Sequence, residues 1–240
     1  MTLVTSRSLV RVDDVLRLLR QEYGPRRWQS RGDPMSVLVA TVLSQNTSDV
    51  NSGRAFDSLM AAFDSWQAMA EASAEDLAGS IRAGGLADIK ARRMKSILQE
   101  IRRERGGFDL DFLRELGLSE AGAWLRKLPG VGPKTAACVL LFSLDMPALP
   151  VDTHVFRVAR RLGLFHSAVS AERAHEVLQQ LVPAKRVYEF HIHMVEHGRK
   201  VCKARQPRCG NCILAGLCSG GMESRGMIRS SGLPVTELRR

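Results

Sequence analysis

The feature that most constrains this chain is a short turn of glycine and proline between two segments of helical pattern. The turn reads Leu128-Pro129-Gly130-Val131-Gly132 and leads directly into an apolar run that begins at Pro133. Proline suits the first position of a helix, where the N–H that it lacks would have no partner. Gly130 and Gly132 can both adopt positive φ, which lets neighbouring backbone N–H groups point the same way. Free N–H groups at a helix N-terminus suit a phosphate, so the turn predicts a phosphate-binding hairpin of two helices.

Two residues of opposite charge accompany the second helix of this hairpin. Lys134 lies in its first turn, and Asp152 follows after a break between Pro147 and Pro150. The helix dipole and the loss of solvent both favour the neutral, nucleophilic form of a lysine amine. A carboxylate opposite that amine can stabilise a developing sugar cation or move protons. The hairpin alone is equally compatible with a structural role, with Lys134 on the surface and Asp152 as an N-cap.

The charge balance indicates what kind of partner the chain has. The 240 residues carry a formal charge of +10, which favours nucleic acid over a membrane as the partner. No apolar run is long enough to span a bilayer, and the first residues lack the apolar core of a signal peptide. We therefore expect a cytoplasmic protein. Only 5% of the residues are aromatic, which favours duplex binding through the backbone over stacking on single strands.

Helical periodicity recurs along the chain and strand-like alternation does not, so the predicted fold class is all-α. Helices are expected over residues 8–23, 35–43, 49–63, 74–81, 88–105, 120–128, 133–144, 152–162, 171–181 and 185–200. Asp33, Ser73 and Ser119 are the expected N-caps of three of them. In the helix from residue 49, the expected inward-facing side chains are Val50, Phe56, Leu59 and Met60. Cys138, on the apolar helix after the hairpin turn, is expected to be buried.

The other four cysteines form a cluster near the end of the chain. They follow the spacing C-x6-C-x2-C-x5-C and are Cys202, Cys209, Cys212 and Cys218. In a cytosolic protein such a cluster favours a metal over disulfides. Four thiolates suit either zinc or a [4Fe–4S] cluster, and the spacing alone does not decide between them. The first loop between the cysteines is basic, and it would present Lys203, Arg205 and Arg208 to phosphates.

Taken together, the motifs LPGVGPKTA, VDTHVFRV and HGRKVC with PRCGNC resemble the endonuclease III family of DNA repair glycosylases. The resemblance covers about residues 10 to 219, and it implies two helical halves with a cleft between them. Residues 34–148 would form a six-helix barrel that carries the helix-hairpin-helix. Residues 9–33 and 149–219 would form the cluster domain, and residues 220–240 would be a basic tail.

The resemblance also implies an activity. Such a protein is a bifunctional DNA glycosylase and abasic-site lyase that removes oxidised or ring-fragmented pyrimidines. The lysine at position 134 would attack the sugar C1′ with help from Asp152, and β-elimination would then cut the strand. The implied cofactor is a [4Fe–4S] cluster held by the four cysteines. The implied partner is double-stranded DNA with a damaged base or an abasic site, bound by a monomer associated with the nucleoid.

The family's DNA-contacting residues map onto three parts of this chain. Its pattern LSxQxTD corresponds to LSQNTSD here, which places Asn46 at the family's glutamine position and Gln45 one residue earlier. These residues would lie beside the flipped base, or the stretch only ends one helix and caps the next. Leu86 corresponds to a leucine that enters the base stack, or it packs back on its helix as in a Schellman motif. Backbone N–H groups of Gly130 and Gly132 would hold a phosphate.

Two alternative functions remain open at this point. One is a monofunctional glycosylase for mispaired or deaminated bases, although such relatives commonly lack a lysine at position 134. The other is a non-catalytic DNA-binding or damage-sensing protein. A match of His193 to His197 with the H-x-x-E-H motif is not interpreted as a protease site, because no third ligand is evident. His191, His193 and His197 are expected to pack or to form hydrogen bonds, and His154 to act near the site or as a cap.

Overall fold

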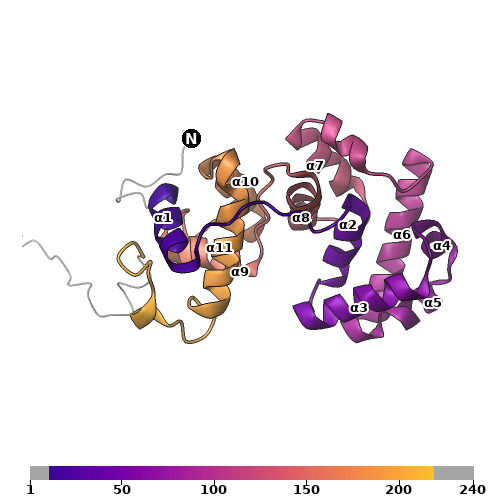
Figure 1. The fold of residues 1–240 in the computed structure, drawn as a ribbon, viewed down its shortest axis with the longest axis horizontal. Coiled ribbons are helices and arrows are strands. Elements are labelled where there is room, and N and C mark those ends of the chain that lie inside the picture. Colours follow the sequence, from indigo (N-terminus) through magenta and orange to yellow (C-terminus); the bar gives the residue numbers. More distant parts are fainter. Residues whose placement is uncertain (1–10, 219–240) are drawn as a thin grey trace, which may run out of the picture. The chain divides into compact units, whose positions relative to one another are not determined.

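The computed structural model describes residues 11–218, and all regular elements in that range are helical (Figure 1). The all-α prediction is therefore confirmed. The α-helices are α1 (Val12–Tyr23), α2 (Pro34–Leu43), α3 (Asp49–Ala62), α4 (Trp66–Glu71), α5 (Ala74–Ser80), α6 (Ala87–Arg105), α7 (Leu118–Lys127), α8 (Pro133–Leu144), α9 (Thr153–Leu162), α10 (Ala171–Leu181) and α11 (Val187–Lys200). Short 3₁₀ helices are η1 (Arg82–Gly84), η2 (Asp111–Glu115), η3 (Ala184–Arg186) and η4 (Cys209–Asn211). No helix in the described range is long and apolar enough to cross a membrane.

The chain divides into two compact units. Within the described residues, the hairpin unit comprises Arg26–Asp152 and Ser170–Ile192, and the cysteine unit comprises residues 11–25, Thr153–Val169 and residues 193–218. Helix α11 begins in the hairpin unit and ends in the cysteine unit. Lys134 and Asp152 both belong to the hairpin unit. The six-helix barrel over residues 34–148 and the cluster domain over residues 9–33 and 149–219 stay predictions. The basic tail over residues 220–240 lies outside the described residues.

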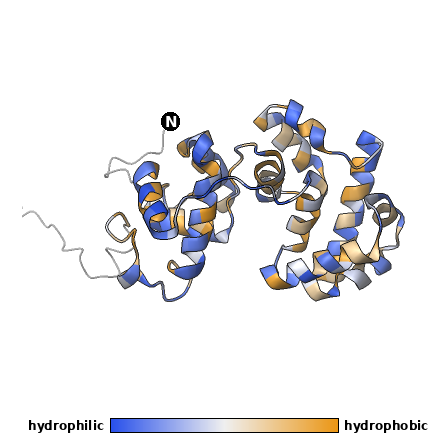
Figure 2. Ribbon diagram, in the orientation of Figure 1, coloured by the Kyte–Doolittle hydropathy of each residue, from blue (hydrophilic) through white to orange (hydrophobic). Residues whose placement is uncertain are grey.

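Helix α8 forms the centre of the hairpin unit. All of its residues from Thr135 to Leu144 are buried, and α2 and α7 pack against it. Figure 2 shows the hydrophobic character of α8. Burial of this kind contributes about 25 cal/mol for each Å² of apolar surface. The carbonyls at the end of α8 are satisfied by Arg114, which donates to Ser143 O at 3.0 Å and to Leu144 O at 3.1 Å. The centre of the unit is thus a rigid helix that begins at the hairpin turn.

The segment between α1 and α2 is also attached to α8. Trp28 Nε1 donates to Leu141 O at 2.7 Å, and the backbone N–H of Arg31 donates to Phe142 O at 2.9 Å. The guanidinium of Arg31 lies 3.9 Å from the centre of the Phe142 ring, in a cation–π contact. These contacts bring a positive charge close to the middle of the hairpin unit.

Several helix starts follow the expected caps, and some details differ. Asp33 accepts the N–H of Ser36 at 3.0 Å, and Ser73 accepts the N–H of Asp76 at 3.0 Å. Helix α7 begins after Gly117, whose N–H is bonded to Glu120 Oε2 at 3.4 Å, so the prediction of Ser119 as N-cap is wrong. Val50 and Met60, predicted to face inward, are 64% and 40% exposed. The short helix α4 is absent from the helices that the sequence predicts.

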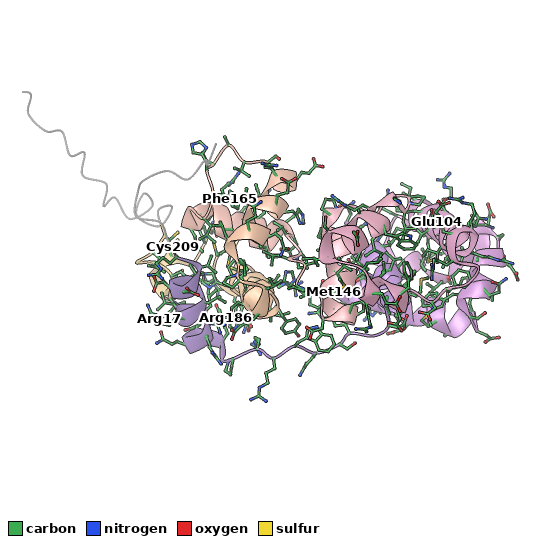
Figure 3. All side chains as sticks on the ribbon, turned by 90° about the horizontal axis from the view of Figure 1, so that it is seen from above. Arg17, Glu104, Met146, Phe165, Arg186 and Cys209 are labelled. Atoms are coloured by element: carbon green, nitrogen blue, oxygen red, sulfur yellow. The ribbon has the colours of Figure 1, made fainter. Side chains whose placement is uncertain are left out.

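The cysteine unit packs α1 against the second part of α11. Tyr23 Oη and His197 Nδ1 are 3.0 Å apart, and His193 Nε2 donates to Gly24 O at 2.9 Å. Both histidines are buried, which confirms their expected packing and hydrogen-bonding role. Figure 3 labels Arg17 on α1 and Cys209 in the loop that follows α11. This loop is the part of the unit that carries the four cysteines.

Candidate active site

The hairpin turn has one glycine in a left-handed conformation. Val131 N–H donates to Leu128 O at 3.1 Å, and Gly130 has φ +72°. Gly132 has φ −90° and ψ 179°, an extended conformation open to any residue. The expectation of positive φ is therefore confirmed for Gly130 and wrong for Gly132. A Cβ at Gly132 would meet nothing within 4 Å. The space next to Gly132 is therefore open to the close approach of another molecule.

Lys134 and Asp152 lie around the same buried groups. Lys134 is the second residue of α8, Asp152 directly precedes α9, and both are partly buried. Cys138, one helical turn after Lys134, is 6% exposed, which confirms its expected burial. Burial raises the pKa of the Cys138 thiol; Lys134 and Arg31 lower it, and Asp152 raises it further. Lys134 and Asp152 therefore both contribute to the electrostatic environment of this buried thiol in the hairpin unit.

His191 is a second buried group of this region. Its Nδ1 lies 2.9 Å from Pro150 O, and its ring meets Phe142 edge-on at 5.4 Å between centroids. Burial lowers the pKa of His191 to about 4, although Asp152 and the bond to Pro150 oppose the shift. A carbonyl only accepts, so the neutral ring carries its proton on Nδ1. His191 thereby anchors the backbone two residues before Asp152. No sequence pattern indicates this contact, because the two residues are far apart in the chain.

The polar loop Ser44–Asp49 follows α2, and helix α6 holds it in place. Lys90 is 2% exposed, and its ammonium donates to Leu43 O at 2.7 Å and to Gly84 O at 2.8 Å. Burial lowers the pKa of Lys90. Gln45 Oε1 accepts a hydrogen bond from Arg93 Nη1 at 2.5 Å, whereas Asn46 is exposed with φ +54°. Of the two predicted base contacts, Asn46 thus presents its side chain to solvent and Gln45 is held by an arginine.

Leu86 stands between η1 and α6 in an unusual state. It has φ +54° and ψ 36°, a left-handed conformation that costs a side-chain-bearing residue about 1–2 kcal/mol. The side chain is 51% exposed, and Ile89, one turn further along α6, is 50% exposed. About half of the Leu86 side chain is open to solvent, and its role as a wedge stays a prediction. An exposed leucine held in a strained conformation fits the wedge interpretation.

The four cysteines occupy one loop, and Arg161 contacts it at several points. Arg161 Nη1 donates to Cys202 Sγ at 3.3 Å and to Lys203 O at 2.7 Å, and Cys218 Sγ lies 3.2 Å from Arg161 O. All four thiols are partly buried and free of disulfides. Burial raises the pKa of the Cys212 thiol, and electrostatic interaction with the other three thiols raises it further. This donor set of four thiols fits a [4Fe–4S] cluster.

The cysteine loop carries exposed basic side chains and is bonded to α9. Lys203, Arg205 and Arg208 are exposed, as the proposed phosphate contacts require. His154 Nδ1 lies 3.1 Å from Arg157 Nη2, and Arg157 also donates to Cys202 O at 2.9 Å. His193 and His197 are hydrogen-bonded to Gly24 O and Tyr23 Oη within the cysteine unit.

Family models match most of the chain. Residues 39–184 match the HhH-GPD superfamily of base excision DNA repair proteins. Residues 202–218 match the iron–sulfur binding domain of endonuclease III. The second match covers all four cysteines, and the first contains both Lys134 and Asp152.

Individual relatives agree with these matches. Endonuclease III of Thermotoga maritima is 39% identical over 186 residues, which cover 78% of this chain and 83% of the relative. Endonuclease III of Escherichia coli K12 is 32% identical over 208 residues, which cover 87% and 94%. A putative DNA glycosylase of Arabidopsis thaliana is 39% identical over 165 residues, 69% of this chain but only 56% of the plant protein.

A solved structure of a trapped endonuclease III–DNA covalent intermediate has a TM-score of 0.79 and 27% identity, covering 89% of this chain and 97% of that one. A non-covalent endonuclease III–DNA complex matches with the same TM-score of 0.79 and the same 27% identity. DNA is therefore the partner that the comparisons support. The chain belongs to the endonuclease III family, whose members are DNA glycosylases and abasic-site lyases of base-excision repair with a [4Fe–4S] cluster.

Proposed function

We propose that this chain removes oxidised or ring-fragmented pyrimidines from duplex DNA, with Lys134 as the nucleophile and Asp152 as the assisting carboxylate. The observation that carries the assignment is that both charges act on the buried Cys138 and His191 within the hairpin unit. Lys134 lies in the first turn of the buried helix α8, so its backbone cannot move without disturbing the core. A nucleophile on a rigid element is well placed for attack on a bound sugar.

The chemistry follows from the amine. Lys134 Nζ forms a bond to the sugar C1′ as the bond from C1′ to the base breaks, and the base leaves with a proton. Ring opening then gives a Schiff base between Nζ and C1′. Loss of a proton from C2′ breaks the bond between C3′ and its oxygen, which cuts the strand. Water finally releases the lysine.

Asp152 serves the same steps as an acid–base group. Its negative charge stabilises the cationic sugar in the transition state, and its carboxylate can move protons to and from the amine and the leaving base. The bond between His191 and Pro150 fixes the backbone next to Asp152, which supports a defined position for the carboxylate. His191 itself is neutral and buried, so it acts here through Asp152.

We assign the DNA contacts to two sets of residues. In the hairpin unit, N–H groups of Gly130 and Gly132 hold a phosphate, Gln45 and Asn46 lie beside the extruded base, and Leu86 fills the vacated stack. In the cysteine unit, the basic loop contacts phosphates through Lys203, Arg205 and Arg208. The exposure of Leu86, Asn46 and the three basic side chains supports these roles.

The cluster would be held by the thiolates of Cys202, Cys209, Cys212 and Cys218. When bound, it supplies a rigid cross-link that orders the loop. We further propose that the protein acts as a monomer on the DNA of the nucleoid, in the cytoplasm. One chain carries both sets of DNA contacts, which supports a monomer.

Borohydride trapping tests this proposal. The protein is incubated with a duplex that carries one oxidised pyrimidine, and borohydride reduces any Schiff base to a stable covalent bond. We expect a trapped complex and a strand cut with wild type and with the control Lys127→Gln, an exposed lysine at the end of α7. Lys134→Gln should bind the duplex but give neither. Asp152→Asn should slow base release at least ~100-fold.

Each other outcome has a definite meaning. Base release by wild type without a trapped complex would point to a monofunctional glycosylase. Binding without base release on a panel of oxidised pyrimidines would favour a damage sensor. Trapping by Lys134→Gln at the wild-type rate would remove Lys134 from the nucleophile role.

A further inference from the structure

Arg93 lies where three distant parts of the hairpin unit meet. It is a partly buried residue of α6, and its guanidinium donates to Gln45 Oε1 in the polar loop after α2. Its side chain also covers the hairpin turn: a Cβ built on Gly130 would lie 2.6 Å from Arg93 Cδ and 3.1 Å from Cζ. The positive φ of Gly130 favours glycine at this position, and the end of the Arg93 side chain lies directly against it.

The charge of Arg93 is not compensated nearby. Within residues 11–218 it forms no ion pair, in contrast to Arg102 and Arg103 on the same helix, which pair with glutamates. Its partner Gln45 is neutral, so the hydrogen bond orients the guanidinium without cancelling its charge. A guanidinium has five N–H donors in a fixed fork, and the bond to Gln45 uses one Nη1–H. An oriented cation without a carboxylate suits an anionic ligand.

We propose that Arg93 is the charged part of the hairpin's phosphate site. Its guanidinium binds the same DNA phosphate that the hairpin N–H groups hold, and Gln45 sets its orientation. The inference rests on the proposed function, since it needs DNA at the hairpin turn. Gln45 then has a second role, because its side chain aims an arginine at the backbone while its exposed neighbour Asn46 faces the base. A phosphate contact of this kind adds affinity without sequence preference.

The experiment measures how duplex binding depends on salt. The probes are an undamaged duplex and one with a tetrahydrofuran abasic-site analogue, which cannot form a Schiff base. Each lost phosphate contact lowers the slope of log K against log salt by about 0.9. For Arg93→Gln we expect that loss on both duplexes, with about tenfold weaker binding at low salt. Arg93→Lys should retain the slope and lose part of the affinity, because it keeps the charge but not the fork.

The matched control is Arg92→Gln, which removes the same charge one residue earlier on α6. Arg92 is exposed and donates to Asp88 O within its own helix. Its slope should equal that of wild type. A second variant, Gln45→Glu, keeps Arg93 and its packing but places a carboxylate on the guanidinium. It should lower the slope by the same amount as Arg93→Gln, and it serves as the test if Arg93→Gln does not fold.

The results decide between the possibilities. An unchanged slope in Arg93→Gln, or in Gln45→Glu where the first variant does not fold, overturns the inference. An equal loss in Arg92→Gln also overturns it, because the effect would then be general charge. A wild type that neither binds the duplexes nor cuts damaged DNA overturns the proposed function as well. A wild type that does both, with unchanged slopes in the variants, overturns only the role of Arg93.

Discussion

Leu86 has a strained backbone and an exposed apolar side chain, and neither property stabilises the folded chain. A leucine with φ +54° is strained, and half of its side chain is exposed to solvent. Replacing it by glycine removes both the strain and the wedge. We therefore expect Leu86→Gly to raise the free energy of unfolding by up to about 1 kcal/mol while lowering base release from duplex DNA about tenfold or more. Urea unfolding and single-turnover kinetics measure the two effects. A variant that is less stable but fully active would contradict the wedge role.

His191 should make stability depend on pH. Burial lowers its pKa from 6.5 to about 4 in the folded chain, so the unfolded chain takes up this proton more readily. The contribution is complete above pH 6.5 and is lost as pH falls toward 4. Between those values wild type should lose about 1.4 kcal/mol per pH unit more than His191→Gln. Urea unfolding from about pH 7.5 to about pH 5.5 checks this, with the exposed His166→Gln as control. Parallel curves for wild type and His191→Gln would contradict it.

At the scale of elements, helix α6 connects the residues of the hairpin unit that are proposed to contact DNA. Its buried Lys90 joins the end of α2 to the turn before Leu86 through Leu43 O and Gly84 O. Lys90→Met keeps most of the volume but leaves two buried carbonyls without their donor. We expect a loss of about 2 kcal/mol or more in the free energy of unfolding and a larger loss of activity than Lys127→Met causes. Stability equal to wild type in Lys90→Met would show that water replaces the ammonium.

The helices themselves could be predicted where caps and turns are local. Asp33 with Pro34, Ser73, and the hairpin with Pro133 each place a helix start within one residue of the observed one. A local hydrophobic pattern does not always predict which side chains are buried. Val50 fits the apolar face of α3 but is exposed, because a hydrophobic pattern does not tell whether its partner is the core or another molecule.

The candidate site also combines residues that a local motif indicates with residues that only long-range contacts reveal. Lys134, Asp152 and the cysteines could be proposed as site residues from the sequence because their motifs are short and specific. Arg93, Lys90 and His191 could not, since each acts through a contact with residues about 40 or more positions away or with the backbone of another turn. In the sequence the basic side chains of α6 form one charged run. Only the packing of the folded chain shows that Lys90 is buried and that Arg93 lies against the hairpin turn.

For the whole molecule, the cluster should support one unit more than the other. Arg157 of α9 donates to Cys202 O in the cysteine loop and to Gly198 O in α11, and Arg161 of α9 donates to Lys203 O and Ala204 O in the loop. The core of the hairpin unit is the buried helix α8, which these bonds do not reach. We expect Cys212→Ala to lose iron and acid-labile sulfide. Amide protection should fall in residues 193–218 and in α9 while it persists in α2 and α8.

The salt dependence of DNA binding is a second measurement of the effect of Cys212→Ala. Disorder of the basic loop would remove the proposed phosphate contacts of Lys203, Arg205 and Arg208. The slope of log K against log salt should then become shallower in Cys212→Ala by about 0.9 for each of up to three lost contacts, while the proposed hairpin contacts remain. Cys138→Ala is the control, because this buried cysteine lies in α8 outside the cluster loop. It should keep its iron and its salt slope. Equal loss of amide protection in α8 and in residues 193–218 of Cys212→Ala would mean that the two units fold as one, and that the cluster supports the entire chain.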